Sequence, residues 1–154
     1  MTYRKFVNEY LSKGLLKEQR PNFKAVEKII LRANKDLKTA KATLSIDEGI
    51  AYSVAYLAML RAARAFMLLK GYRPVDGYQH KTAVEFIAHL LGEEYRDIIE
   101  RFDGMRRKRN IFTYEIDVAI SLTEASKAFD TATAFVKIIK DSIRKDSPQV
   151  EFRF

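Results

Sequence analysis

The chain has 154 residues, of which 47% are hydrophobic, and its 28 Lys and Arg against 20 Asp and Glu give a formal net charge of +8. It contains no Cys, which excludes disulfides, thiolate metal sites and cysteine nucleophiles, and two histidines leave little for a histidine-based zinc site. The longest unbroken apolar run, Val54–Leu60, is far shorter than the ~20 residues of a membrane-spanning helix. We therefore expect one domain over residues 1–154, cytoplasmic, with no membrane partner and no cofactor.

The first long helix that the sequence predicts begins at Asn22 and has a basic outer face. Apolar residues recur at steps of three and four from Val26 to Leu44, and five lysines and one arginine lie between Asn22 and Leu44. A short amphipathic helix is predicted before it, within residues 1–13.

The second long helix is apolar around nearly its whole circumference, which is typical of a helix at the centre of a fold. We expect it to begin at a capping box, Ser45–Glu48, and to end at Gly71. Small residues line one face and allow another helix to approach closely. This alanine stripe consists of Ala51, Ala55, Ala58, Ala62 and Ala65.

The rest of the chain is predicted to form helices separated by breakers. These segments are a loop at 72–78, helices at about 79–91 and 93–109, a break at 110–117, and a final helix that starts at the capping box Ser121–Glu124 and ends at Pro148. No segment shows the alternation of a strand. The expected fold class is all-α, an up-and-down bundle of about five main helices plus a short N-terminal helix. Its core spans about 22–145, and a flexible tail, frayed or bound to a partner, spans about 147–154.

The densest positive charge is the run Arg106, Arg107, Lys108 and Arg109, which Asn110 follows directly. Successive helical residues are about 100° apart, so four consecutive side chains surround the helix and cannot all line one pocket. One interpretation is a solubilising helix terminus, where cations stabilise the negative end of the helix dipole. The other is a phosphate-binding cluster that positions a polyanion without reading its bases.

Several segments together resemble the HEPN domain, a helical bundle of this size. HEPN members carry an Arg-x4–6-His motif, often Arg-Asn-x-x-x-His, at the end of the penultimate core helix, and Arg109-Asn110-Ile-Phe-Thr-Tyr114 occupies that place. Residues 38–44 resemble the family's first core helix and residues 52–71 its Ala-rich central helix. His80 lies where many members have a His that opens the next helix. The resemblance extends over roughly residues 22–145.

The resemblance implies a function directed at RNA. Such domains usually act as homodimers in which two motifs meet in a cleft, and many are toxins paired with a nucleotidyltransferase-type antitoxin. Cleavage in the family is metal-independent: a 2′-hydroxyl attacks the adjacent phosphate, which requires a base, an acid and a cation near the phosphoryl oxygens. By resemblance, Arg109 is that cation and Asn110 orients the phosphate.

The motif departs from the family at its last position, where Tyr114 replaces the His. Phenol titrates near ~10 and imidazole near ~6.5, so tyrosine is a poor base at neutral pH, although it can donate a proton to a leaving group. Acid–base catalysis contributes about 10²–10⁴-fold, and we therefore expect weak or absent ribonuclease activity. His80 and His89 are alternative sources of an imidazole. The other interpretation of Tyr114 is a buried aromatic that holds its segment against the last helix.

Two arginines, Arg61 and Arg64, interrupt the apolar central helix. A buried charge is costly unless it is paired, so these side chains need carboxylate partners or an opening to solvent. In one interpretation they form salt bridges with the helix at 93–109, whose acidic residues are Glu94, Asp97, Glu100 and Asp103. In the other they line the same cleft as Arg109 and bind nucleic acid together with Arg106–Lys108.

Three functions remain open at this point. The first is a metal-independent ribonuclease or toxin that acts through Arg109, Asn110 and Tyr114. The second is a catalytically inactive homodimer that binds RNA, a nucleotide or an acidic partner such as a nucleotidyltransferase-type antitoxin. The third is an interaction protein that dimerises through the alanine stripe.

Overall fold

The computed structural model describes residues 1–115 and 117–152, and it confirms the predicted all-α bundle. The elements are, in chain order, α1 (Tyr3–Ser12), β1 (Leu16–Glu18), α2 (Phe23–Thr43), α3 (Glu48–Lys70), β2 (Tyr72–Pro74), α4 (Gln79–Leu91), the 3-10 turn η1 (Glu93–Tyr95), α5 (Arg96–Tyr114) and α6 (Leu122–Asp146). In this part of the chain α2 to α6 are the five main helices, and α1 is the short N-terminal one.

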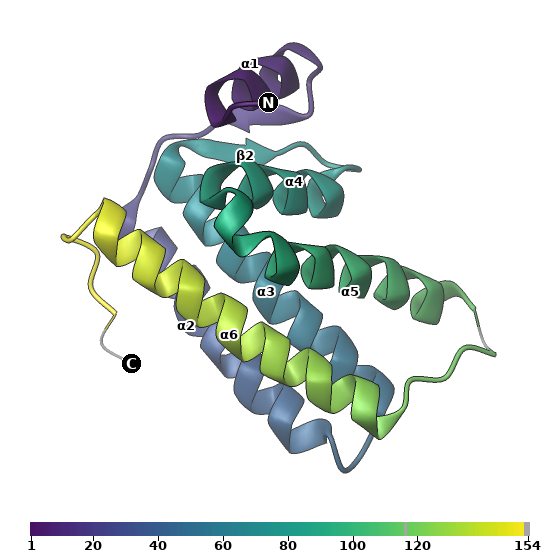
Figure 1. Ribbon diagram of the computed structural model, residues 1–154. Helices are drawn as coiled ribbons and strands as arrows, with labels where there is room; N and C mark the ends of the chain where they lie inside the picture. Colours follow the sequence, from purple (N-terminus) through teal and green to yellow (C-terminus); the bar gives the residue numbers. More distant parts are fainter. Residues whose placement is uncertain (116, 153–154) are drawn as a thin grey trace.

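α3 lies at the centre of the bundle and contacts α2, α4, α5 and α6 (Figure 1). Each alanine of its stripe is at most 1% exposed, because the chain's own helices cover it. The prediction of a dimer interface at the alanine stripe is therefore wrong. Within the described residues, α3 is also the one helix long and apolar enough to cross a membrane, yet 72% of that stretch is buried inside the protein, as in a core helix.

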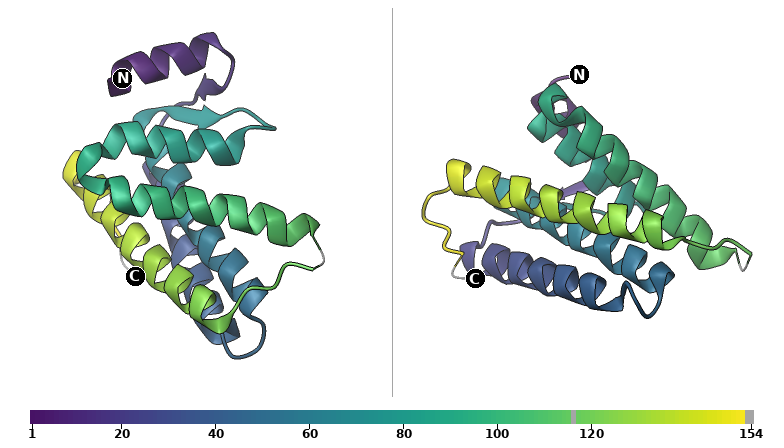
Figure 2. Two further views of the ribbon diagram at one scale, coloured as in Figure 1. Left: turned by 45° about the vertical axis from the view of Figure 1, so that its right-hand side comes forward. Right: turned by 60° about the horizontal axis from the view of Figure 1, so that its bottom comes forward.

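The other main helices surround α3 in two groups. α2 and α6 run alongside it, and α4 and α5 lie across another side, so that α5 and α6 diverge from each other in the second view of Figure 2. Aromatic rings join the groups at the centre: Phe102 of α5 lies 4.9 Å from Phe135 of α6 and 5.8 Å from Tyr56 of α3, centroid to centroid. These buried rings fix the position of α5, the helix that carries the basic run.

The helix starts follow local capping chemistry, with one correction. Asn22 and Ser121 are the N-caps of α2 and α6, as predicted, and each side chain accepts a hydrogen bond from a backbone N–H three residues later. The N-cap of α3 is Asp47 rather than Ser45, and the Asp47 carboxylate accepts a hydrogen bond from the Ile50 N–H at 3.0 Å. Residues 44–46 form the turn between α2 and α3, so the capping role passes to Asp47, an equally good N-cap residue.

A two-stranded antiparallel ladder, which the sequence did not predict, joins the N-terminal segment to the loop after α3. β1 pairs with β2 so that Leu16 lies opposite Pro74 and Glu18 opposite Tyr72. Three-residue strands are too short to show alternation in the sequence. α1 is fixed beside the ladder by Phe6, which is 1% exposed and stacks on His89 of α4 at 4.3 Å.

α5 is longer than predicted, since it continues beyond Arg109 to Tyr114. The sequence from Asn110 to Tyr114 is rich in β-branched and aromatic residues, which lower helix propensity and led us to expect a break. Packing overrides that preference: Phe112 lies against Gly49 near the start of α3. The Arg-Asn motif is therefore part of the last turns of a helix and not of a loop.

The segment after α6 differs from the flexible tail that we predicted. Up to residue 152 it lies along the chain's own α2: Val150 is 4% exposed, and the Glu151 N–H donates to a Glu27 carboxylate oxygen at 2.9 Å. Phe152 lies under the cations of Lys140 and Arg144. Residues 153–154 of the predicted tail lie outside the described residues.

Candidate functional site

The four cations of the basic run point in different directions, as the helical geometry predicts. Arg106 Nε lies 2.8 Å from Asp103 Oδ1 and Arg107 Nε lies 3.6 Å from Asp103 Oδ2, so one carboxylate serves both. Lys108 Nζ lies 3.0 Å from Glu124 Oε2 and ties the end of α5 to the start of α6. The hydrogen bond with Lys108 is the main reason why the pKa of the Glu124 carboxyl is lowered. Three of the four cations are thus already paired within the chain.

Arg109 is the exception. Its side chain is half-buried, and no carboxylate in residues 1–115 and 117–152 forms an ion pair with it. After burial, its positive charge is the next cause that lowers the pKa of His80 of α4, and it acts against the burial that raises the pKa of Tyr56 of α3. Arg109 therefore lies within electrostatic range of the junction of α3 and α4 where Tyr56 and His80 lie. Its guanidinium, which has no carboxylate partner among the described residues, keeps its donors for a ligand.

Tyr56 and His80 form a hydrogen-bonded pair at this junction. The Tyr56 hydroxyl lies 2.9 Å from His80 Nδ1, and the two rings stack. Burial raises the pKa of Tyr56 well above its ordinary value, so the phenol stays protonated at neutral pH. Burial and then the charges of Arg109, Arg64 and Arg106 lower the pKa of His80. The imidazole is therefore neutral at pH 7, and we call Tyr56, His80, Arg106 and Arg109 the motif cluster.

The other two residues of the motif differ in their exposure to solvent. Asn110 is half-buried, next to Arg109 in the helix, whereas Tyr114 is 81% exposed at the end of α5. The interpretation of Tyr114 as a buried aromatic that packs on the last helix is therefore wrong, and the half-buried Phe112 instead packs against Gly49 of α3. A Cβ placed on Gly49 would be 2.3 Å from Phe112 Cζ, so the absence of a side chain at Gly49 lets this end of α5 approach α3.

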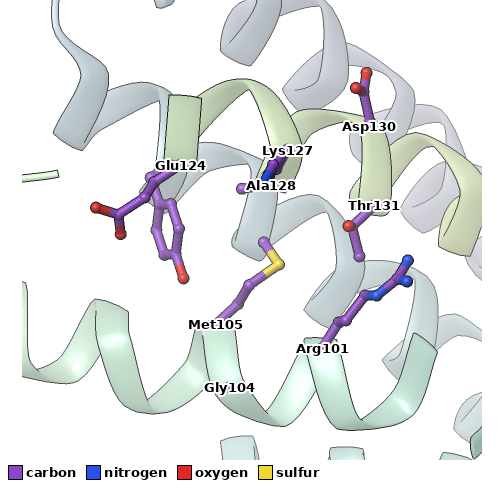
Figure 3. Close-up of a pocket in the computed structure, with 9 residues that line it drawn as sticks. Arg101, Gly104, Met105, Glu124, Lys127, Ala128, Asp130 and Thr131 are labelled. Carbon is purple, nitrogen blue, oxygen red and sulfur yellow. The ribbon is translucent and has the colours of Figure 1, made fainter. Parts of the chain in front are cut away.

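A groove of about 620 Å³ runs between α5 and α6 (Figure 3), and none of the four residues of the motif cluster lines it. Met105 projects from α5 toward α6 within it, with Arg101 and Thr131 at one end and Glu124 at the other. Its charged residues are two cations and two carboxylates: Arg101, Lys127, Glu124 and Asp130. Because these charges balance, the groove offers a polyanion no net attraction.

Arg61 and Arg64 are not paired with α5, so the salt-bridge partners predicted for Arg61 were the wrong ones. Arg61 Nη1 bonds Asp36 of α2, a carboxylate that is 2% exposed and also lies 3.3 Å from Arg32 Nη2. Arg64 is exposed. Both arginines line a second pocket, between α2, α3 and β2, whose lining includes none of residues 106–110.

Sequence reasoning missed three residues that organise these sites. Neither Tyr56 nor Asp36 was singled out, and Asp103 was assigned to the wrong arginines. The i, i+3 spacing of Asp103 and Arg106 was a usable signal. Nothing in the sequence points to the Tyr56–His80 or Asp36–Arg61 pairs, because their members are 24 and 25 residues apart. Among the residues described, no group of three or more His, Asp or Glu side chains is placed to hold a metal ion.

Comparison with known proteins places the chain in a family. The HEPN domain matches residues 26–142, which include α3, α4, α5 and the motif Arg109–Tyr114. Searches of curated proteins and of solved structures find no match. The family match covers well over half of the chain and agrees with the helical bundle described above. The chain therefore belongs to the HEPN domain family.

Proposed function

We propose that this HEPN domain binds RNA through a surface centred on Arg109. The observation that carries the proposal is that Arg109, alone among the four cations of the basic run, has no carboxylate partner in the described residues. A guanidinium can grip a phosphate with two parallel hydrogen bonds, and a half-buried one is held in position for it. The net charge of +8 adds a long-range attraction for a polyanion.

The surroundings of Arg109 favour single-stranded RNA. Arg107 is 65% exposed on the same helix and can contact a neighbouring phosphate. Tyr114, 81% exposed one turn later, offers a ring on which an unpaired base can stack. Cations for the backbone and an aromatic ring for a base are the usual elements of single-strand recognition.

The binding test uses a fluorescently labelled single-stranded RNA and anisotropy at several salt concentrations. We expect Arg109→Ala to weaken binding about ten-fold or more, because a charge-assisted contact is lost. The matched control is Arg96→Ala, which removes an exposed arginine at the other end of α5. Equal affinities for the two variants, or an affinity that does not fall with added salt, would contradict the proposal.

A second candidate function, RNA cleavage, is favoured by the neutral imidazole of His80. In this reaction the 2′-hydroxyl attacks the adjacent phosphorus and the bond to the 5′-oxygen breaks, which leaves a 2′,3′-cyclic phosphate and a 5′-hydroxyl. When His80 Nδ1–H donates to the Tyr56 oxygen, Nε2 presents a lone pair that can accept the 2′-hydroxyl proton. Tyr114 can return a proton to the leaving oxygen, and Arg109 can stabilise the charge on the phosphoryl oxygens.

The cleavage test incubates RNA with the pure protein in EDTA and analyses the ends of the products. We expect a slow reaction with cyclic phosphate products that His80→Gln reduces about 100-fold or more. His89→Gln is the control, since His89 stacks on Phe6 at another face of α4. If the RNA stays intact while binding depends on Arg109, the protein binds RNA without cleaving it.

We also propose that two copies meet at the end of the bundle that carries Tyr114. Large apolar side chains are exposed on the α2–α3 turn, at the start of α3, at the end of α5 and at the start of α6. They are Ile46, Ile50, Ile111, Tyr114 and Leu122, from 46% to 81% exposed. Gel filtration with light scattering should show a dimer that Ile111→Glu dissociates and Tyr78→Glu, at a distant exposed tyrosine, does not. A monomeric wild type that binds a nucleotidyltransferase-type protein instead would assign this surface to that partner.

A further inference from the structure

A second concentration of positive charge lies outside the motif cluster, in the pocket between α2, α3 and β2. The pocket has a volume of about 400 Å³, within the range of small-ligand sites. Five of its lining residues are cationic, and they come from three different elements. They are Lys28 and Arg32 of α2, Arg61 and Arg64 of α3, and Arg73 of β2. We call this site the basic pocket.

The charge of the basic pocket is not balanced by its lining. None of the described lining residues is acidic. The carboxylate in contact with these cations is that of Asp36, which lies beneath Arg61 and Arg32 and neutralises one charge. In residues 1–115 and 117–152, no carboxylate pairs with Lys28, Arg64 or Arg73. Gathering like charges raises the free energy of the folded chain, and a bound anion would remove that cost.

Asp36 also prepares the pocket for a ligand. It is almost completely buried and holds Arg61 and Arg32 by one guanidinium nitrogen each, Nη1 and Nη2 respectively. A guanidinium has five N–H donors, so each arginine keeps most of its donors for another partner. Because the buried carboxylate already restrains both side chains, less conformational entropy is lost when a ligand binds.

The walls of the basic pocket are partly apolar. Leu68 and Pro74 are buried, and Tyr72 is half-buried, with its ring 5.9 Å from that of Phe86. The basic pocket is concave, cationic and lined in part by buried apolar residues. Such a pocket suits a short ligand whose negative charges lie close together. An extended RNA strand carries one charge per nucleotide and would leave most of these five cations without a phosphate.

We propose that the basic pocket binds a small ligand with two or more adjacent phosphate groups, whether a nucleoside polyphosphate or inorganic polyphosphate. The clustered phosphates contact Lys28, Arg64 and Arg73 at the open side and Arg32 and Arg61 at the side held by Asp36. The lining of this site includes none of residues 106–110, which carry the proposed RNA surface, and neither proposal depends on the other.

The experiment measures binding of sodium tripolyphosphate, ATP and orthophosphate by titration calorimetry and by thermal shift, with the ionic strength held constant. The pocket variant is Lys28→Ala/Arg73→Ala. Its control is Lys35→Ala/Lys38→Ala, which removes the same charge from exposed positions of α2 outside the pocket. We expect tripolyphosphate to raise the Tm of the wild type and the control, and to bind the pocket variant about ten-fold or more weakly.

The comparison of ATP with tripolyphosphate distinguishes a nucleoside polyphosphate from inorganic polyphosphate as the ligand. Tighter binding of ATP than of tripolyphosphate identifies a nucleotide, and equal binding identifies the phosphate chain alone. Equal affinity of tripolyphosphate for the pocket and control variants would overturn the proposal, as would orthophosphate binding as tightly as tripolyphosphate. Loss of the ligand on Arg109→Ala would also overturn it. If the double variant does not fold, Lys28→Ala alone, at an exposed side chain, serves instead.

Discussion

Two carboxylates in this protein each serve two arginines, and their surroundings are opposite. Asp103 shares α5 with Arg106 and Arg107, and its side chain is 32% exposed. Asp36 joins Arg32 of its own helix to Arg61 of α3, and its side chain is 2% exposed. The first group is a local surface network on one helix, and the second is a buried connection between two helices.

The comparison shows that charge density along the sequence does not locate the densest charge in space. The run 106–109 is the most basic stretch of the chain, yet three of its four cations are paired. The basic pocket draws its five cations from separate elements, and three of them have no carboxylate partner among the described residues. The fold therefore brings together cationic residues that are far apart in the sequence.

The largest effect is expected from removing the buried carboxylate. Asp36→Ala leaves Arg61 without its buried partner, and we expect the free energy of unfolding to fall by about 3 kcal/mol. Asp103→Ala is the matched change at the exposed carboxylate and should cost about 0.5 kcal/mol, because surface ion pairs contribute little. Urea denaturation followed by circular dichroism measures both. Similar losses for the two variants would remove the distinction between the networks.

An intermediate effect is expected where α5 meets α3. Gly49→Ala places a methyl group against the Phe112 ring, and we expect a loss of about 1–2 kcal/mol together with weaker RNA binding, since Phe112 positions the end of α5. Gly104→Ala, within α5, meets no atom within 4 Å and should instead stabilise the helix by about 0.5–1 kcal/mol. Denaturation midpoints and RNA anisotropy test both. A Gly49 variant as stable as the wild type would show that this contact does not hold α5.

The smallest effect is a dependence of stability on pH from His80. Burial and the nearby arginines lower the pKa of folded His80 below its ordinary value of 6.5. The unfolded chain therefore binds more protons below about pH 6.5, so stability should fall with decreasing pH until the folded imidazole also protonates. His80→Gln should reduce this dependence, which urea denaturation at several pH values measures. A steeper decline in His80→Gln would mean that the imidazole is stabilised as a cation.

The sequence predicted the long elements because periodicity and breakers are local signals. α4 was predicted at its observed bounds, and Asn22, Gly71 and Ser121 marked ends of helices correctly. The β1–β2 ladder and the extension of α5 to Tyr114 depend on pairing and packing between distant segments, such as Leu16 with Pro74 and Phe112 with Gly49. Such contacts override local propensity and produce no periodic pattern of apolar residues in the sequence.

The site was predictable only in part, for the same reason. The resemblance located Arg109 and Asn110, and helical geometry separated the four cations. The partner of His80 is Tyr56 and that of Arg61 is Asp36, both set by how helices pack. A motif names residues along the chain, whereas the pairing of side chains across helices follows from the complete fold.

The ladder between β1 and β2 has a consequence for work on shortened forms of the protein. The family match starts at residue 26, so a truncation to that boundary would discard α1 and β1. β2 would lose its hydrogen-bonded neighbour, and Arg73, which lies opposite Lys17 in the ladder, would no longer be held at the edge of its pocket. We therefore expect a fragment that begins at residue 26 and still folds to keep the RNA binding proposed for α5 but to lose the polyphosphate binding proposed for the basic pocket.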